Sequence, residues 1–140
     1  MRSILILAAL AGVCVAVQTS LTGAAQRSLG PAVLVAISGL TTGFCALVVS
    51  FFVARPEFTG RAVAYALASG VLGAVIVGSI AVAAGQAGVA RALSLVIAAQ
   101  LITGLALDAL GVFGAGADFS IPRALGVALI IAGGALVVSY

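Results

Sequence analysis

Isolated polar side chains inside long apolar runs are the residues of this sequence whose types could do chemistry. They are amides and hydroxyls, which donate and accept hydrogen bonds without carrying charge. Inside a membrane such groups are costly unless they find a partner. A neutral lining of this kind suits an uncharged or zwitterionic solute better than a bare cation. The residues that we predict to line a solute pathway are Gln18, Thr22, Ser38, Thr42, Gln100 and Thr103.

The sequence gives little support for catalysis or metal binding. It has no histidine and one methionine, so the usual ligands of zinc and haem are scarce. It also offers no nucleophile with a neighbouring base. We therefore predict no catalytic residues, no metal site, no cofactor and no enzymatic activity. Cys14 and Cys45 lie inside apolar runs, which predicts buried small apolar residues rather than a disulfide framework.

Asp108 is the only acidic residue inside an apolar run. It follows Gln100 by about 12 Å along a helix, which places it near one membrane interface. There it could pair with an arginine, cap a neighbouring helix or titrate during transport, so it is either a coupling acid or a structural one. No carboxylate lies at mid-span, which argues against proton-coupled cation exchange at a central acid.

The composition of the chain identifies its environment. Of its 140 residues, 64% are hydrophobic and 6% are charged, whereas soluble domains carry about 25% charge. This excludes a soluble globule and a disordered chain, and the net charge of +3 is too small for a nucleic-acid binder. A helix needs about 20 apolar residues to cross a bilayer. We predict an all-α integral membrane protein, with one domain over residues 1–140 and helices at about 3–22, 32–53, 62–84, 89–112 and 123–140.

Small residues recur at four-residue spacing in several of these helices, and such residues share one helix face. In lipid, small side chains allow helix backbones to approach closely. The contacts could lie within one chain or form the seam of a dimer. The glycines that we predict to serve helix packing are Gly12, Gly39, Gly43, Gly70 and Gly78.

The arginines give only a small bias in orientation. Five crossings would place the termini on opposite sides of the membrane, with four arginines on the N-terminal side and two on the other. The side with more arginines tends to remain in the cytoplasm, so a difference this small is compatible with insertion in both orientations. The four are Arg2, Arg55, Arg61 and Arg123, and the two are Arg27 and Arg91.

Several stretches together resemble a known family. They are Gln18 to Gly30, Gly39 to Gly43, the run Leu107-Asp108-Ala109-Leu110-Gly111 after Gln100, and Pro122-Arg123 near the end. This order resembles the small YdcZ-type proteins of the drug/metabolite transporter superfamily. The chain departs from their pattern with Thr22 in place of Asn, Ala109 in place of His, and Gly85-Gln86-Ala87-Gly88 in place of Pro-Arg-Leu-Gly. Any substrate contact made by those Asn, His or Arg side chains is altered here.

The resemblance implies a fold, a partner and a function. Larger superfamily members contain two five-helix halves inserted in opposite orientations, and this chain is similar to one half. It therefore implies an antiparallel homodimer with ten helices in the bacterial cytoplasmic (inner) membrane. Such a dimer would be a secondary transporter of a small organic solute, working by alternating access between two inverted units. The alternatives are a non-transporting accessory subunit and half of a heterodimeric transporter.

Overall fold

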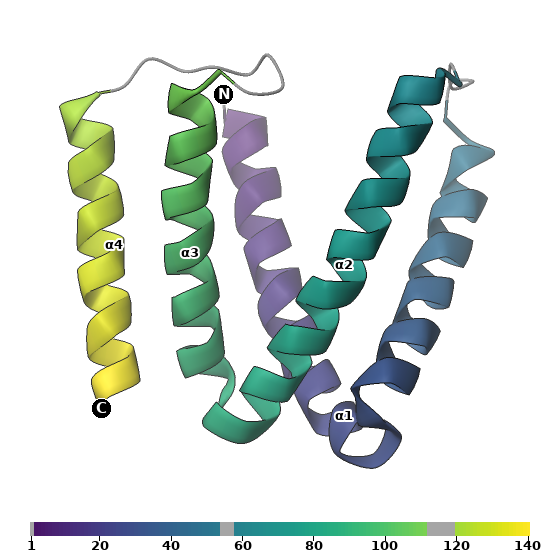
Figure 1. The fold of residues 1–140 in the computed structure, drawn as a ribbon, viewed down its shortest axis with the longest axis horizontal. Helices are drawn as coiled ribbons and strands as arrows, with labels where there is room; N and C mark the ends of the chain where they lie inside the picture. Colours follow the sequence, from purple (N-terminus) through teal and green to yellow (C-terminus); the bar gives the residue numbers. More distant parts are fainter. Residues whose placement is uncertain (1, 54–57, 112–119) are drawn as a thin grey trace. The chain divides into compact units, whose positions relative to one another are not determined.

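The computed structural model describes residues 2–53, 58–111 and 120–140, and the regular elements in these ranges are all α-helices (Figure 1). Each of the four helices is long and apolar enough to cross a membrane. The prediction of an all-helical membrane protein is confirmed. Arg55 and the predicted helix end at Val112 lie outside the described residues. The helices are α1 (Arg2–Ser50), α2 (Gly60–Ala87), α3 (Val89–Ala109) and α4 (Ile121–Ser139).

α1 reverses its direction at Gly30, the one residue inside it with non-helical backbone angles (φ 74°, ψ 158°). A positive φ favours glycine, which has no Cβ to clash with the backbone. The next residue, Pro31, has no N–H and suits the first turn of a new helix. Residues 2–29 and 31–50 are therefore two helical stretches, called here the first and second segments of α1 (Figure 1). The first segment continues past Thr22, where the sequence predicts its end.

The chain divides into two compact units, and the single domain over residues 1–140 stays a prediction. The N-terminal unit is Met1–Gln86 and contains α1 and α2, while the C-terminal unit is Ala87–Tyr140 and contains α3 and α4. The boundary lies next to Gly88, whose φ of 89° breaks the helix between α2 and α3. Within the C-terminal unit, α3 and α4 pack directly against each other.

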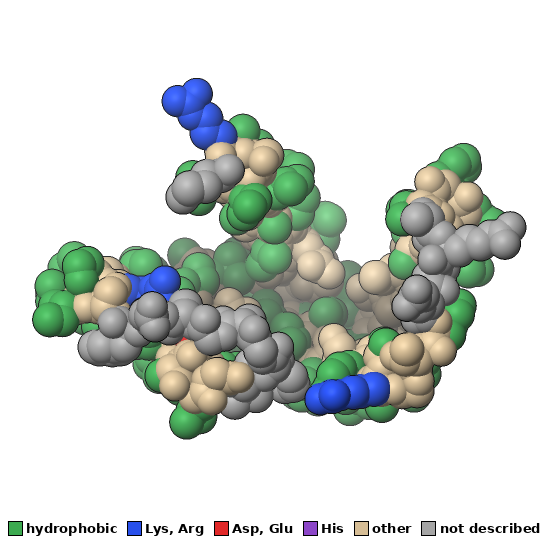
Figure 2. All heavy atoms as spheres, turned by 90° about the horizontal axis from the view of Figure 1, so that it is seen from above, with side chains coloured by type: hydrophobic (Ala, Val, Ile, Leu, Met, Phe, Trp, Pro, Cys, Tyr) green, Lys and Arg blue, Asp and Glu red, His purple; other side chains and the backbone are tan. Residues whose placement is uncertain are grey.

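Apolar side chains cover the outside of the molecule, and few of them are buried. Figure 2 shows many hydrophobic side chains on the visible face, and Leu40 and Leu129 are 76% and 73% exposed. Cys14 and Cys45 are also exposed, so the prediction that they are buried is wrong for a single chain. The reason is that spans of this protein have an apolar outer face for lipid as well as an inner one. An apolar side chain on such a helix need not lie in the core.

Candidate functional site

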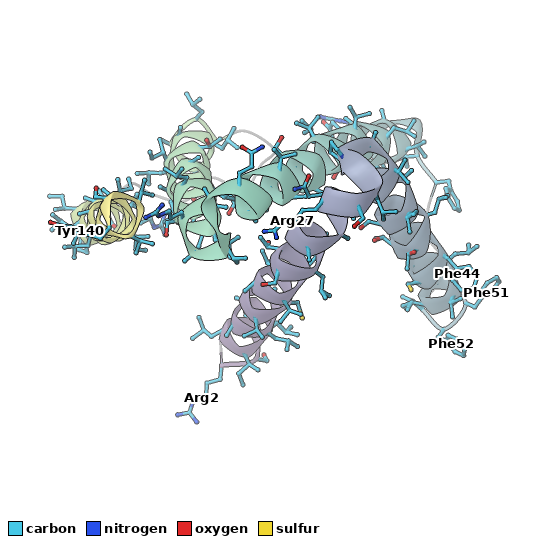
Figure 3. All side chains as sticks on the ribbon, turned by 90° about the horizontal axis from the view of Figure 1, so that it is seen from below. Arg2, Arg27, Phe44, Phe51, Phe52 and Tyr140 are labelled. Carbon is cyan, nitrogen blue, oxygen red and sulfur yellow. The ribbon has the colours of Figure 1, made fainter. Side chains whose placement is uncertain are left out.

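The first segment of α1 and the end of α2 touch through small residues. A Cβ built on Gly23 would lie 3.3 Å from Cβ of Ala84, and the amide of Gln26 lies directly over Gly85. Arg27 stands at the same crossing (Figure 3), where its Nη2 donates a hydrogen bond to the Gly85 carbonyl over 3.1 Å. This bond satisfies one of the carbonyls that the last turn of a helix leaves open. We call this crossing the closed end of the N-terminal unit.

Buried residues of the N-terminal unit gather at the closed end. On α1, Thr19, Thr22 and Gly23 are buried at the spacing of one helix face. On α2, the buried residues are Ala81 and Ala84. The small side chains let the two backbones approach, which in lipid is the main source of helix association. The closed end therefore fixes how the first segment of α1 and α2 cross.

A hollow of about 800 Å³ lies between the two segments of α1 and α2. Its lining residues come from near the middle of all three helical stretches, for example Leu40 in residues 31–50 and Gly73 in α2. The middle of a spanning helix lies at the middle of the bilayer. The hollow is lined by Gln18, Val35, Ala36, Ser38, Gly39, Leu40, Thr42, Gly43, Gly70, Gly73, Ala74 and Val77.

Three polar side chains of this lining are open to a solute. Ser38 and Thr42 stand one turn apart on the second segment of α1, and Gln18 comes from the first segment. Among the described residues, none of these three side chains has a hydrogen-bond partner. The adjacent Thr41 differs, because its hydroxyl donates to the Ile37 carbonyl over 2.9 Å. The hydrogen-bonding capacity of Gln18, Ser38 and Thr42 is thus available inside the hollow.

Glycines keep the hollow wide. A Cβ built on Gly39, Gly43 or Gly70 would meet no atom within 4 Å, so these glycines border open space. The sequence predicts a packing role for all three, together with Gly12 and Gly78. Gly12 also has no neighbour within 4 Å, while Gly78 lies 3.4 Å from Cγ2 of Val35, measured from its built Cβ. Within one chain, close contacts lie at Gly23 and Gly85, and a packing role for Gly12, Gly39, Gly43 and Gly70 stays a prediction.

Thr22, a predicted pathway residue, is buried and bonds to its own helix. It is 8% exposed, and its hydroxyl donates to the carbonyls of Gln18 and Thr19 over 2.9 Å and 3.2 Å. A threonine in a helix often satisfies its hydroxyl on the preceding turn in this way. Thr22 is not among the residues that line the hollow. Thr22 lies at the closed end, one helical turn from Gln18. The packing at the closed end therefore also holds the turn that carries Gln18.

Gln100 and Thr103, also predicted to line the pathway, belong to the C-terminal unit. Both are exposed on α3, and neither lines the apolar groove of about 410 Å³ between α3 and α4. The structure therefore groups Gln18, Ser38 and Thr42 in one hollow and leaves the polar pair of α3 on an outer face of its unit. That Gln100 faces a cavity rather than lipid stays a prediction.

A second polar pair in the N-terminal unit is not among the predicted pathway residues. Ser79 and Gln86 line another hollow, of about 980 Å³, between the second segment of α1 and α2. They stand seven residues apart, which places them two turns apart on one face of α2. That spacing could have identified the pair. The polar groups of Gln86 lie near the end of α2, where contact with the membrane interface is expected.

An ion pair joins α3 and α4 in the C-terminal unit. Nη1 of Arg123 lies 3.9 Å from Oδ2 of Asp108, and the side chains of Arg123 and Asp108 are 45% and 42% exposed. Of the roles open to Asp108 from the sequence, the structure shows pairing with an arginine. A pair this exposed contributes about 0 to 1 kcal/mol. It ties the end of α3 to the start of α4.

The chemistry of the hollow in the N-terminal unit is neutral. Its lining holds no acidic or basic side chain, and the described residues hold no group of three or more metal-ligating side chains. Amide and hydroxyl groups there can bind a solute through hydrogen bonds, and the apolar residues between them can cover its hydrocarbon part. The arrangement fits recognition of a small molecule.

Comparison with known proteins identifies the family of the chain. Residues 3–136 match the family model described as "Putative inner membrane exporter, YdcZ", while no curated protein and no solved structure matches. The match spans both units, and it confirms the resemblance seen in the sequence. It also agrees with the four helices that can cross a membrane. The chain therefore belongs to the YdcZ family of inner membrane exporters, and it is a multi-pass protein of that membrane.

Proposed function

We propose that the protein is a secondary transporter that moves a small organic solute by alternating access. The observation that carries this proposal is the hollow at mid-span, with Gln18, Ser38 and Thr42 open to it. Transporters with inverted repeats hold their solute near the middle of the bilayer. The proposal extends the family description, which gives a membrane exporter without a mechanism.

Counting α1 as two spans gives five crossings. Its segments, residues 2–29 and 31–50, are joined by the non-helical Gly30. Each segment is long enough for a hydrocarbon core of about 30 Å at 1.5 Å of rise per residue. With α2, α3 and α4, the termini would then lie on opposite sides of the membrane. An odd number of spans is what one half of an inverted pair requires.

We propose that the working unit is an antiparallel homodimer, in which two copies insert in opposite orientations and supply ten helices. The small arginine bias supports insertion in both orientations. The broad apolar surface, with Leu40 and Leu129 among its exposed residues, supports contact with lipid and with a second copy. In such a pair, exchanging the conformations of the two subunits converts the inward-facing state into the outward-facing one.

The transport proposal is tested by filling the hollow. A Cβ built on Gly70 meets no protein atom within 4 Å. Gly70→Leu should therefore leave the helix intact while its side chain blocks the hollow. The matched control is Gly133→Leu, which also meets no atom within 4 Å and lies on α4. Liposomes containing each variant would be loaded with a defined mixture of amino acids, amines, carboxylates, sugars and amides. Efflux of each compound would be followed by mass spectrometry.

We expect the native chain and Gly133→Leu to release the same subset of compounds, and Gly70→Leu to release none of it faster than empty liposomes do. Equal efflux from the two variants would show that the hollow is not the pathway. Absence of protein-dependent efflux from the native chain would instead favour an accessory subunit or half of a heterodimer.

The dual orientation is tested by labelling from each side of the membrane. Single cysteines at Ser28 and Thr59, in a chain with Cys14 and Cys45 replaced by alanine, would be treated with a maleimide that does not cross membranes. We expect part of the population to react at each position from each side. If every copy reacts at Thr59 from the cytoplasm alone, the antiparallel dimer is wrong.

A further inference from the structure

The lining of the hollow indicates the chemical class of its solute. We infer that the hollow binds an uncharged amphipathic solute whose hydrogen-bonding edge faces α1 and whose hydrocarbon face lies on α2. The inference rests on the proposed function, since it assigns a ligand to the same hollow. The sequence allows both uncharged and zwitterionic solutes. This inference excludes the zwitterionic ones.

The two helices contribute different chemistry to the hollow. α1 supplies all of its hydrogen-bonding side chains, Gln18, Ser38 and Thr42. α2 supplies no polar side chain to it; its contribution is Gly70, Gly73, Ala74 and Val77. A solute that satisfies both walls must have polar groups along one edge and hydrocarbon along the opposite side. The position of the polar residues on the two segments of α1, and of none on α2, therefore sets the orientation of the solute.

The neutral lining disfavours a charged solute. A charge placed among these residues would lose its hydration without gaining an opposite charge, which is costly at membrane depth. The arginines nearest in sequence to the hollow are already engaged: Arg27 donates to the Gly85 carbonyl. Arg61 donates to the hydroxyl of Tyr65 over 3.0 Å and stacks 5.6 Å from the centre of its ring. A zwitterion would carry two charges without a partner.

The polar groups of α1 suit a solute with both a donor and an acceptor. The amide of Gln18 offers an acceptor oxygen and two donor hydrogens, and each hydroxyl can donate and accept. Ser38 and Thr42 lie one turn apart, so they present two hydroxyls in a row along the helix. A carboxamide or a hydroxyl group can bond to both kinds of side chain. An ammonium group cannot accept hydrogen bonds and a carboxylate cannot donate them.

A cysteine in the apolar wall can report occupation of the hollow. Val77→Cys places a thiol in the α2 wall of this hollow, at a residue that does not line the hollow of about 980 Å³, in full-length protein with Cys14→Ala and Cys45→Ala. The control is Ala68→Cys, an exposed position of α2 outside the hollow. Both variants, reconstituted in liposomes, would react with N-ethylmaleimide in the presence of phenylacetamide, phenylacetate or 2-phenylethylammonium. These probes share one skeleton and differ mainly in charge and in hydrogen-bonding groups.

We expect phenylacetamide to slow the reaction of Val77→Cys at concentrations about tenfold lower than either ion, a difference of about 1.4 kcal/mol in binding free energy. None of the probes should protect Ala68→Cys. Because the hollow has no titratable side chain, the ratio of rates with and without phenylacetamide should stay constant from about pH 6 to about pH 8. Protection by either ion that equals or exceeds that by the amide overturns the inference, and so does absence of protection by all three.

Failure of this inference can be separated from failure of the transport proposal. If Gly70→Leu blocks efflux and an ion protects the cysteine, the hollow is the pathway and the uncharged solute is rejected. If phenylacetamide protects the cysteine and Gly70→Leu leaves efflux intact, the hollow binds the uncharged class of ligand but is not the transport pathway.

Discussion

The N-terminal and C-terminal units place polar groups in opposite ways. In the N-terminal unit, small residues close one end of the helices, and the polar side chains of α1 line a hollow near their middle. In the C-terminal unit, α3 and α4 enclose an apolar groove, and the charged pair Asp108–Arg123 lies at the end of the helices. The N-terminal unit therefore carries the proposed binding site, whereas α3 and α4 of the C-terminal unit form a packed pair.

The difference shows that residue type alone does not assign a role inside a membrane. Thr22, Thr41 and Thr42 all lie on α1, yet the first two donate to carbonyls of the preceding turn, while Thr42 is open to the hollow. Ser94 of α3 also bonds to the preceding turn, at the Ala90 carbonyl. A hydroxyl becomes available to a solute only where the helix facing it leaves space, as α2 does with its glycines.

The largest expected effect concerns the closed end of the N-terminal unit. Gly23→Leu would force side-chain atoms into Ala84 and the backbone at Gly85, and overpacking of this kind costs about 1 to 3 kcal/mol. We expect a lower melting temperature and loss of solute binding, because the crossing also positions Gln18. Thermal unfolding in detergent would measure the first effect. A Cβ built on Gly12 meets no atom within 4 Å, so the control variant Gly12→Leu should leave the melting temperature nearly unchanged. Equal losses of melting temperature in both variants would show that Gly23 has no special packing role at the closed end.

A smaller effect is expected where α3 and α4 meet. A Cβ on Gly134 would lie 3.5 Å from the Ser94 carbonyl oxygen, so Gly134→Ala should be tolerated and Gly134→Leu should cost about 1 kcal/mol. The adjacent Gly133 meets nothing within 4 Å, and Gly133→Leu is the control. Both variants should keep the binding of phenylacetamide, because the hollow belongs to the other unit. Loss of binding in Gly134→Leu would mean that the two units are not independent.

The smallest effect is expected at the ion pair. Asp108→Asn and Arg123→Gln should each change the free energy of unfolding by less than about 1 kcal/mol, since both side chains are nearly half exposed. The double variant should differ little from the singles in a double-mutant cycle. A large loss of efflux in Asp108→Asn at unchanged stability would assign a coupling role to this acid. It would also extend the functional site beyond the N-terminal unit.

Much of the fold follows from the sequence. Apolar runs long enough to cross a bilayer predict the helices, and the reversal at Gly30 falls in the gap between the predicted helices at 3–22 and 32–53. The sequence predicts a helix end at about Thr22, whereas in the structure the helix continues to residue 29. Gly23, just after the predicted end, packs against Ala84. A glycine inside a membrane helix can serve close packing as readily as a turn.

The site could be predicted only in part. The types and depth of Gln18, Ser38 and Thr42 identify them as candidates, and the structure groups them. The hydrogen bond from the Thr22 hydroxyl to the Gln18 carbonyl depends on the rotamer of Thr22, which composition does not determine. The roles of Gly39, Gly43 and Gly70 depend on which helix face meets a neighbour. Spacing alone shows that such residues share a face, but not whether that face borders a helix, a hollow or a second copy.

The single-residue connection within α1 has a consequence for biogenesis. Only Gly30 separates residues 2–29 from residues 31–50, so the hydrophilic stretch at the reversal is short and consists of Gln26, Arg27 and Ser28 at the end of the first segment. Backbone groups at such a reversal must still be hydrated or bonded, which favours its location at a membrane surface. The two stretches would then enter the lipid together as a preformed hairpin rather than one after the other. Lengthening this connection with polar residues should slow insertion and separate the two events.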